Sequence, residues 1–142
     1  MIIQYKKLHA DAHDPYKKHE TDFCWDLCAL GDHVVYTYAT IPTGLQIEIP
    51  QEHYGMILSR SGLAKDYGAF VLNAPGIIDA GYTGEVQIVL GNIEPDSAVS
   101  IHDGERIAQI AILPYKTTYM SRNDTLMFYS TRGSKGFGST GY

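Results

Sequence analysis

The sequence predicts an all-β fold: a distorted jelly-roll β-barrel with at most one short helix and a flexible C-terminal arm. Short apolar runs rich in β-branched and aromatic residues recur along the chain and are separated by glycine and proline turns. Eleven tyrosines and fourteen glycines favour strands and turns over helices. Strands do not alternate with long helical patterns, and no internal repeat is present. A parallel α/β sheet and a repeat protein are therefore excluded.

Length and composition favour one globular domain. A chain of 142 residues with 44% apolar and 19% charged residues can bury a sizeable core. Residues 1–130 are expected to form this domain, and residues 131–142, which include four glycines, a C-terminal arm. The net charge of −5 argues against direct nucleic-acid binding, and no apolar run approaches the length of a membrane span.

The two cysteines and three of the six histidines carry no recognisable metal motif. Cys24 and Cys28 have three residues between them and no second pair, so we expect reduced, packed thiols, as in a cytosolic protein. His9, His13 and His19 lie in a polar stretch that has the character of a solvated loop.

The first half of the chain contains five strand candidates. Residues 1–8 alternate loosely, and residues 9–20 form a polar loop. Residues 23–30 are apolar except for Asp26, which either points to solvent from a half-buried strand or faces a site, because an unpaired buried carboxylate is costly. The other three candidates are residues 33–41, 45–49 and 54–59, separated by turns at Pro42-Thr43-Gly44 and Pro50-Gln51-Glu52-His53.

One helix and further strands are predicted in the second half. Residues 61–67 form a short helix with Ser61 as its cap. Val71-Leu72 and residues 86–90 flank a turn, residues 92–96 form a loop, and residues 98–101 and 106–113 form strands.

Asp79 lies in the turn between residues 72 and 86, directly after Ile77 and Ile78. Its apolar neighbours predict a buried carboxylate placed for chemistry. The alternative is an acid that only caps the turn through an Asx hydrogen bond.

Two stretches carry groups suited to phosphate. Ser59-Arg60-Ser61-Gly62 places a guanidinium between two hydroxyls before the helix, although a helix cap with a surface arginine explains the same pattern. Gln109 lies within an apolar strand, where its amide needs a partner. The glycine-rich residues 132–141 surround one aromatic residue, Phe137, and can fold over a planar base while gripping phosphates.

In this order, the chain resembles the trimeric dUTP diphosphatase (dUTPase) family, which has five motifs. The matching stretches are Phe23-Cys24-Trp25-Asp26-Leu27, Ser59-Arg60-Ser61-Gly62-Leu63-Ala64, Asn73 to Glu85, Gly104 to Gln109 and Arg132 to Gly141. The resemblance implies hydrolysis of dUTP to dUMP and pyrophosphate, which limits uracil in DNA and supplies dUMP for dTMP synthesis.

The resemblance also implies roles for single residues. Asp79 would be the general base for the water that attacks the α-phosphorus. Tyr82 would pack under the deoxyribose, and Asn73 would bind uracil with the hairpin backbone around Gly76 and Ile78. The remaining matches are substrate-binding residues, mostly phosphate contacts: Arg60, Ser61, Gly62, Gln109, Arg132, Phe137 (the base-stacking ring), Gly138, Ser139 and Thr140. Mg²⁺ is the implied cofactor, and Asp26 would reach it through water.

The family is homotrimeric with shared sites, which implies the same assembly here, and a cytoplasmic location (the host-cell cytoplasm for a viral chain). Cys24-Trp25, Ser59, Thr83 and Lys135 depart from the usual motif pattern. A related alternative is dCTP deaminase, whose glutamate would fall at Val89. Some viral relatives also act as protein-binding regulators, so a regulatory protein partner is a second alternative.

Overall fold

The computed structural model describes residues 1–94, 96–125 and 127. In this part of the chain eleven strands and one short helix form, which confirms the predicted all-β class. In chain order they are β1 (Tyr5–Lys7), β2 (Trp25–Cys28), β3 (His33–Val35), β4 (Tyr38–Pro42), β5 (Leu45–Ile47), β6 (His53–Leu58), α1 (Ser61–Tyr67), β7 (Ala69–Val71), β8 (Gly76–Ile78), β9 (Gln87–Asn92), β10 (Val99–Ile101) and β11 (Arg106–Pro114).

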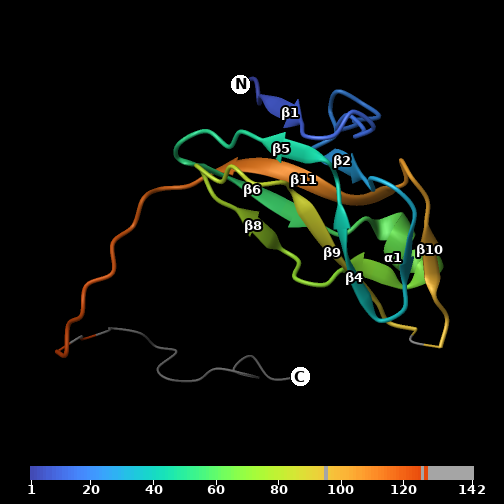
Figure 1. Ribbon diagram of the computed structural model, residues 1–142. Helices are drawn as coiled ribbons and strands as arrows, with labels where there is room; N and C mark the ends of the chain where they lie inside the picture. Colours follow the sequence, from blue (N-terminus) through green and yellow to red (C-terminus); the bar gives the residue numbers. More distant parts are fainter. Residues whose placement is uncertain (95, 126, 128–142) are drawn as a thin grey trace.

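The strands form four small antiparallel sheets. The largest has the order β2-β11-β6-β8, and a three-stranded sheet has the order β4-β9-β7. Two-stranded pairs, β1 with β5 and β10 with β3, complete the body. Strand β11 crosses the middle of the molecule, with β6 on one side and β2 on the other (Figure 1). Residues from distant parts of the chain therefore meet along β11.

The core lies between these sheets and follows the strand period of two. In β9 the inward side chains of Ile88 and Leu90 are buried, whereas Gln87 is exposed and Val89 half-buried. Other fully buried side chains include Leu27, Val35, Ile41, Leu45, Val71, Ile101 and Ile107, from β2, β3, β4, β5, β7, β10 and β11. Each buried aliphatic side chain contributes about 1.5–3 kcal/mol, so the core fixes the sheets around the site.

The strand predicted at residues 33–41 is in fact two strands. β3 pairs with β10 and β4 pairs with β9, so the chain changes sheet at residues 36–37. The buried amide of Asn92 holds this break, because its Nδ2 donates to the carbonyls of Val35 and Tyr36 at 3.4 and 3.0 Å. The apolar run carries no sign of this partner from far along the chain.

The predicted strand–turn–strand at residues 71–90 is also more complex. β7 and β9 do pair, with Val71 opposite Leu90. Between them, however, β8 leaves this sheet and pairs with β6, with Gly76 opposite Ile57. We call residues 72–86 the hairpin segment. It bridges two sheets instead of making one tight turn.

Smaller differences concern the ends of elements. The first strand is limited to β1, and the helix runs over the predicted residues. Its N-cap is Arg60, with extended backbone angles and no side-chain cap bond, so the prediction of Ser61 as cap is wrong. At the other end Gly68 adopts φ +64°, the left-handed conformation that favours glycine. Residues 115–125 leave the body after β11 as an extended segment without a strand (Figure 1).

Candidate active site

One carboxylate and two guanidinium groups meet where β2, β6 and β11 lie side by side. Asp26 on β2 accepts from Nε of Arg60 through Oδ1 at 3.0 Å, and from Nη1 of Arg106 through Oδ2 at 3.1 Å. The Asp26 side chain is only 20% exposed. We call Asp26, Arg60 and Arg106 the arginine cluster. Asp26 is thus a paired carboxylate and does not simply point to solvent, the first of the two alternatives that its sequence context left open.

Arg60 is held at a second point, since its Nη1 donates to the carbonyl of Arg106 at 2.7 Å. A guanidinium has five N–H donors, and acceptors among the described residues take two of those on Arg60. The other three can reach an anion. A fixed arginine with free donors is suited to a phosphate.

Gln109 lies in the same place because of strand register. On β11 it is opposite Asp26 of β2 and opposite Leu58 of β6. Its Nε2 donates to the carbonyl of Ser59 at 2.8 Å, which is the partner that the sequence required. The Oγ of Ser59 in turn accepts from the backbone of Val71 at 2.9 Å. Ser61 and Gly62 follow at the exposed start of α1.

The hairpin segment presents the other predicted residues. Asn73, Asp79 and Tyr82 are exposed, Ile78 is half-buried, and Gly76 is buried. The prediction of a buried Asp79 is therefore wrong for the single chain. β8 ends one residue before Asp79, and the turn beyond it closes through Tyr82 N–H to the Asp79 carbonyl at 3.1 Å. Among the residues that the structure describes, none forms a side-chain hydrogen bond with the exposed Asp79 carboxylate, so an external ligand or water can reach it.

A small pocket of about 50 Å³ lies beside Gly76, lined also by Asn73, Ile57 and Gln87. A Cβ at Gly76 would lie 3.2 Å from Nδ2 of Asn73 and 3.4 Å from Cβ of Ile57. Glycine is needed here because the backbone approaches its neighbours closely. Two amide residues, Asn73 and Gln87, and several apolar residues line this pocket, a combination that suits the edge of a planar base.

The ring of Tyr82 lies across Gly84. Its hydroxyl donates to the carbonyl of Glu85 at 2.9 Å. A Cβ at Gly84 would overlap the Tyr82 ring, so only glycine allows this ring position. Gly84 is a positioning residue that the sequence did not single out.

Hydrogen bonds from residues 43–46, in the loop before β5 and in β5 itself, hold the C-terminal end of the hairpin segment. The buried hydroxyl of Thr43, 1% exposed, donates to the Val86 carbonyl at 2.6 Å and accepts from Leu45 N–H at 3.2 Å. The carboxylate of Glu85 accepts from Gly44 N–H at 2.7 Å. Nε2 of Gln46 donates to the Thr83 carbonyl at 2.8 Å. We call Thr43, Glu85 and Gln46 the hairpin clamp.

The arginine cluster and Asp79 lie apart in one chain. Along the β6–β8 ladder Gly55 is opposite Ile78, which places Asp79 level with Tyr54. Four residues, about 13 Å at 3.3 Å each, separate Tyr54 from Leu58, and Arg60 comes after Leu58. The two groups therefore do not meet at one place within a single chain.

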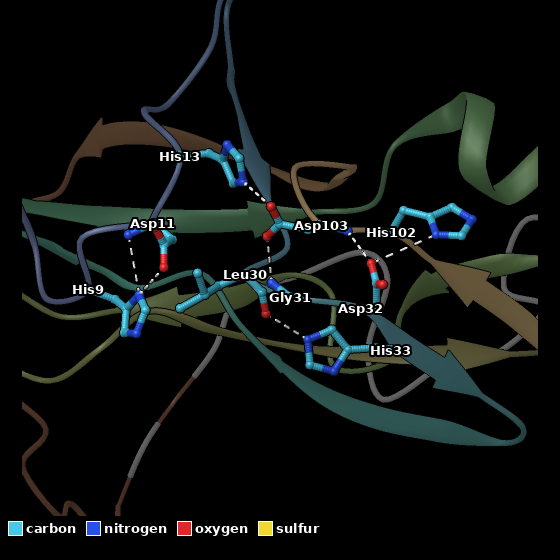
Figure 2. Close-up of polar contacts among 9 residues, drawn as sticks. All are labelled: His9, Asp11, His13, Leu30, Gly31, Asp32, His33, His102 and Asp103. Carbon is cyan, nitrogen blue, oxygen red and sulfur yellow. Dashed lines mark hydrogen bonds and ion pairs between the residues drawn. The ribbon is translucent and has the colours of Figure 1, made fainter.

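The turn before Arg106 is braced by Asp103 (Figure 2). The Asp103 carboxylate accepts from Gly31 N–H at 2.6 Å and lies 3.1 Å from Nε2 of His13. Its own N–H donates to Asp32 at 2.8 Å. The Gly31 amide, and then the His13 hydrogen bond, lower the pKa of Asp103 below its ordinary value. The ionised side chain thus ties three loops together beside the arginine cluster.

Neither the thiols nor the histidines form a metal site. Cys24 and Cys28 are free, and burial raises the pKa of both thiols. His9 and His13 interact with Asp11 and Asp103 respectively (Figure 2). Within residues 1–94, 96–125 and 127, no three His, Cys, Asp or Glu side chains converge to hold a metal ion, and no helix is long and apolar enough to cross a membrane.

Comparison with known proteins decides the family. Residues 10–141 match the sequence profile of the dUTPase family. This chain belongs to the dUTPase family. A deoxyuridine 5'-triphosphate nucleotidohydrolase of Rhodococcus erythropolis is 38% identical over 147 residues, which cover 99% of this chain and 87% of that protein.

Solved dUTPase structures have the same fold. A mutant dUTPase of Staphylococcus bacteriophage 80alpha, solved with dUpNHpp, has a TM-score of 0.89 and 28% identity, covering 99% of each chain. A mutant dUTPase of phage phi11 of S. aureus, described with a structural Mg(II) ion, has a TM-score of 0.80, and the match covers 90% of this chain and all of that one; at 23% identity it supports the fold alone. The jelly-roll prediction is thereby confirmed.

The dUTPase motifs fall into two groups in this structure. Asp26, Arg60, Ser61, Gly62 and Gln109 gather around β11, and the third motif forms the hairpin segment. The fifth motif, with Arg132, Phe137, Gly138, Ser139 and Thr140, lies outside the described residues. Sequence reasoning gave no role to Thr43 or Gly84, and it noted Arg106 only as a second arginine near Gln109 at the start of a strand. Thr43 was assigned only to a turn, although a threonine between Pro42 and Gly44 is a polar residue that could have signalled a buried bond.

Proposed function

We propose that this protein hydrolyses dUTP to dUMP and pyrophosphate. The observation that carries the proposal is the dUTPase family match over residues 10–141, which includes Asp79. The supporting geometry is an accessible carboxylate on a loop fixed by the hairpin clamp. The reaction limits uracil in DNA and supplies dUMP for dTMP synthesis. The free cysteines fit a cytoplasmic location, or the host cytoplasm for a viral chain.

In the proposed mechanism Asp79 is the general base. Its carboxylate takes a proton from a water molecule as the water oxygen bonds to the α-phosphorus. The bond from the α-phosphorus to the α,β-bridging oxygen breaks, and pyrophosphate leaves with that oxygen. The clamp holds Asp79 and Tyr82 in place during this step, and the guanidinium of Arg60 stabilises negative charge on the phosphates.

Selectivity is assigned to the hairpin segment. Asn73 and the backbone near Gly76 and Ile78 would form hydrogen bonds with the edge of uracil, and cytosine would offer donors and acceptors in the wrong places. Tyr82 would pack under the deoxyribose and leave no room for a 2′-hydroxyl. Its position across Gly84 supports this role, because the ring cannot retreat without losing its bond to Glu85.

The residues present fit a phosphate-held Mg²⁺ better than a site made of protein ligands alone. Asp26 supplies a half-buried carboxylate next to Arg60 and Gln109, and no convergent set of protein ligands exists in the described part of the chain. Mg²⁺ prefers to keep several waters and to bind substrate phosphates. Asp26 would hold the ion through water. When bound, the ion neutralises charge on the phosphate oxygens.

A homotrimer with shared sites belongs to the same proposal. The separation of Asp79 from Arg60 supports it, and so does an apolar sheet face. On the outer face of β4-β9-β7, Tyr38 and Phe70 flank Gly91, and Leu72 lies beside Val89. Tyr38 is 65% exposed. Second copies of the chain would cover this face, and residues 131–142 would close over a site as an arm.

Two alternatives are tested together with the proposal. A dCTP deaminase needs a glutamate where this chain has the half-buried Val89. A regulatory protein partner would add to hydrolysis and not replace it.

The experiment measures pyrophosphate release with Mg²⁺ from dUTP, dCTP, dTTP and UTP separately, with ammonia followed for dCTP. We expect release from dUTP only. Asp79→Asn should retain dUpNHpp binding while turnover falls by several orders of magnitude, whereas Asp96→Asn, which removes an exposed loop carboxylate, should match the wild type. Full turnover in Asp79→Asn, or ammonia from dCTP, would contradict the proposal.

A further inference from the structure

A second group of cations lies next to the arginine cluster. Lys17 and Lys18 line an open pocket of about 320 Å³, and Asp26 and Gln109 line the same pocket. The lysines come from the loop before β2, outside the five motifs. The pocket is therefore continuous with residues already placed at the phosphate end of the site.

The backbone fixes this loop against the site. Tyr16 and Asp26 form an isolated antiparallel bridge, with N–H to carbonyl distances of 3.0 and 2.7 Å in the two directions. The guanidinium of Arg106 lies 5.3 Å from the ring centre of Tyr16. Because the bridge is antiparallel, the residues after Tyr16 run alongside those before Asp26, which places Lys17 beside Trp25 and Lys18 beside Cys24.

The two lysines differ in their surroundings. Nζ of Lys17 lies 5.0 Å from the ring centre of Trp25, and this cation–π contact holds the half-buried side chain. Lys18 is exposed and can turn toward a ligand. Trp25 also departs from the usual pattern of the first motif, and the structure gives it a use, as the platform for Lys17.

Positive charge is concentrated around this pocket, although the whole chain carries a net negative charge. The protein has 11 Lys and Arg residues and a net charge of −5. Four of these cations, Lys17, Lys18, Arg60 and Arg106, surround the pocket or pair with Asp26. Asp22 and Asp26 are the carboxylates in the pocket lining. This excess of positive charge fits a polyvalent anion.

We propose that Lys17 and Lys18 bind the β- and γ-phosphates of the nucleotide, beyond the phosphate contacts of Arg60 and Gln109. The inference rests on the proposed dUTP hydrolysis, and it adds residues outside the motifs to the binding site. Lys18 makes the direct contact from the face of β2 that carries Asp26, and Lys17, which lines the same pocket, adds positive charge. In this proposal the single phosphate of dUMP does not extend into the pocket, so dUMP does not contact the two lysines.

The experiment compares Lys17→Gln, Lys18→Gln and the double variant with the wild type, with Lys65→Gln as the control of equal charge on the exposed side of α1. Binding of dUpNHpp, dUMP and inorganic tripolyphosphate is measured by calorimetry at two salt concentrations, and thermal unfolding checks each fold. For the double variant we expect roughly tenfold weaker dUpNHpp and tripolyphosphate binding, with a shallower salt dependence. Its KM for dUTP should rise with kcat nearly unchanged, and Lys18→Arg should restore binding.

Three other results have a defined meaning. Unchanged dUpNHpp binding in a double variant that folds normally overturns the proposal, and so does equal weakening for dUpNHpp and dUMP. If the wild type binds tripolyphosphate through these lysines yet neither hydrolyses dUTP nor binds dUpNHpp, the proposed function fails and the polyphosphate site remains.

Discussion

Nε of Arg60 donates to Oδ1 of Asp26 at 3.0 Å, although the two residues are 34 positions apart in the chain. This bond links the first dUTPase motif to the second. Because Asp26 also accepts from Arg106, one carboxylate orients two guanidinium groups. A carboxylate that the sequence suggested as a metal contact therefore also positions the cations that would bind phosphate.

Asp26→Asn should weaken both the positioning of the two arginines and the proposed contact with Mg²⁺. Its amide cannot compensate two guanidinium groups, so we expect a loss of about 1–3 kcal/mol in the free energy of unfolding and weaker dUpNHpp binding even without Mg²⁺. Urea unfolding and calorimetry with and without Mg²⁺ measure the two effects. A variant that differs from the wild type only in its Mg²⁺ requirement would show that orientation of the arginines does not depend on this charge.

Gly84→Ala should displace the Tyr82 ring, because the new methyl group occupies its place. The free energy of unfolding should change little, since an exposed ring can swing into solvent. We expect the ratio of kcat/KM for dUTP to that for UTP to fall roughly tenfold or more. Tyr82→Phe is the comparison: it keeps the ring over Gly84 and loses only the bond to Glu85 that holds the ring there, so its selectivity should fall by less than that of Gly84→Ala.

Thr43→Val removes the hydroxyl of the hairpin clamp while preserving side-chain shape. The Val86 carbonyl and the Leu45 amide then lose a buried partner, which should cost about 1–3 kcal/mol. Urea unfolding measures this loss, and kcat should fall because the hairpin segment is less firmly held. Thr43→Ser keeps the hydroxyl and should retain kcat. Equal kcat values for the valine variant and the wild type would show that the clamp serves the fold alone.

The pH dependence of stability should change in Asp103→Asn. The pKa of Asp103 is lower in the folded chain than its ordinary value of 3.8. Its ionised form therefore stabilises the folded state above about pH 4, and this contribution is lost as the pH falls through the folded pKa. The Tm of the variant should be lower than that of the wild type at pH 7, and the difference between the two Tm values should become smaller below pH 3.8. Asp11→Asn, in the same group of loops (Figure 2), is the control.

The sequence predicted most strands and the helix because these depend on local patterns, whereas a shared role of Arg60 and Gln109 was implied only by the resemblance of the ordered motifs. β11 and α1 have nearly the expected bounds. β11 is an almost continuous apolar run that is interrupted at Gln109 and ends at Pro114, and α1 buries only Leu63 and is followed by Gly68. Such signals are complete within about ten residues of chain.

What the sequence did not predict depends on distant partners. The break between β3 and β4 requires the Asn92 amide, and the separate pairing of β8 requires β6. The pairing of Asp26 with two arginines likewise follows from strand register. Asp79 was expected to be buried because Ile77 and Ile78 precede it, but Ile77 is itself 52% exposed. In the proposed trimer a second copy would cover this surface.

The distance along β6 between the level of Asp79 and Arg60 has a genetic consequence. Suppose that each site takes its general base, Asp79, from one chain and its arginine cluster from another. A mutation in one chain then inactivates sites that this chain shares with other copies. Chains with Asp79→Asn and chains with Arg60→Ala would each be inactive alone. Co-expressed, they would form mixed assemblies in which some sites combine two intact halves. Two defective alleles would thus complement one another. An excess of either mutant chain would lower the activity of wild-type chains in mixed assemblies.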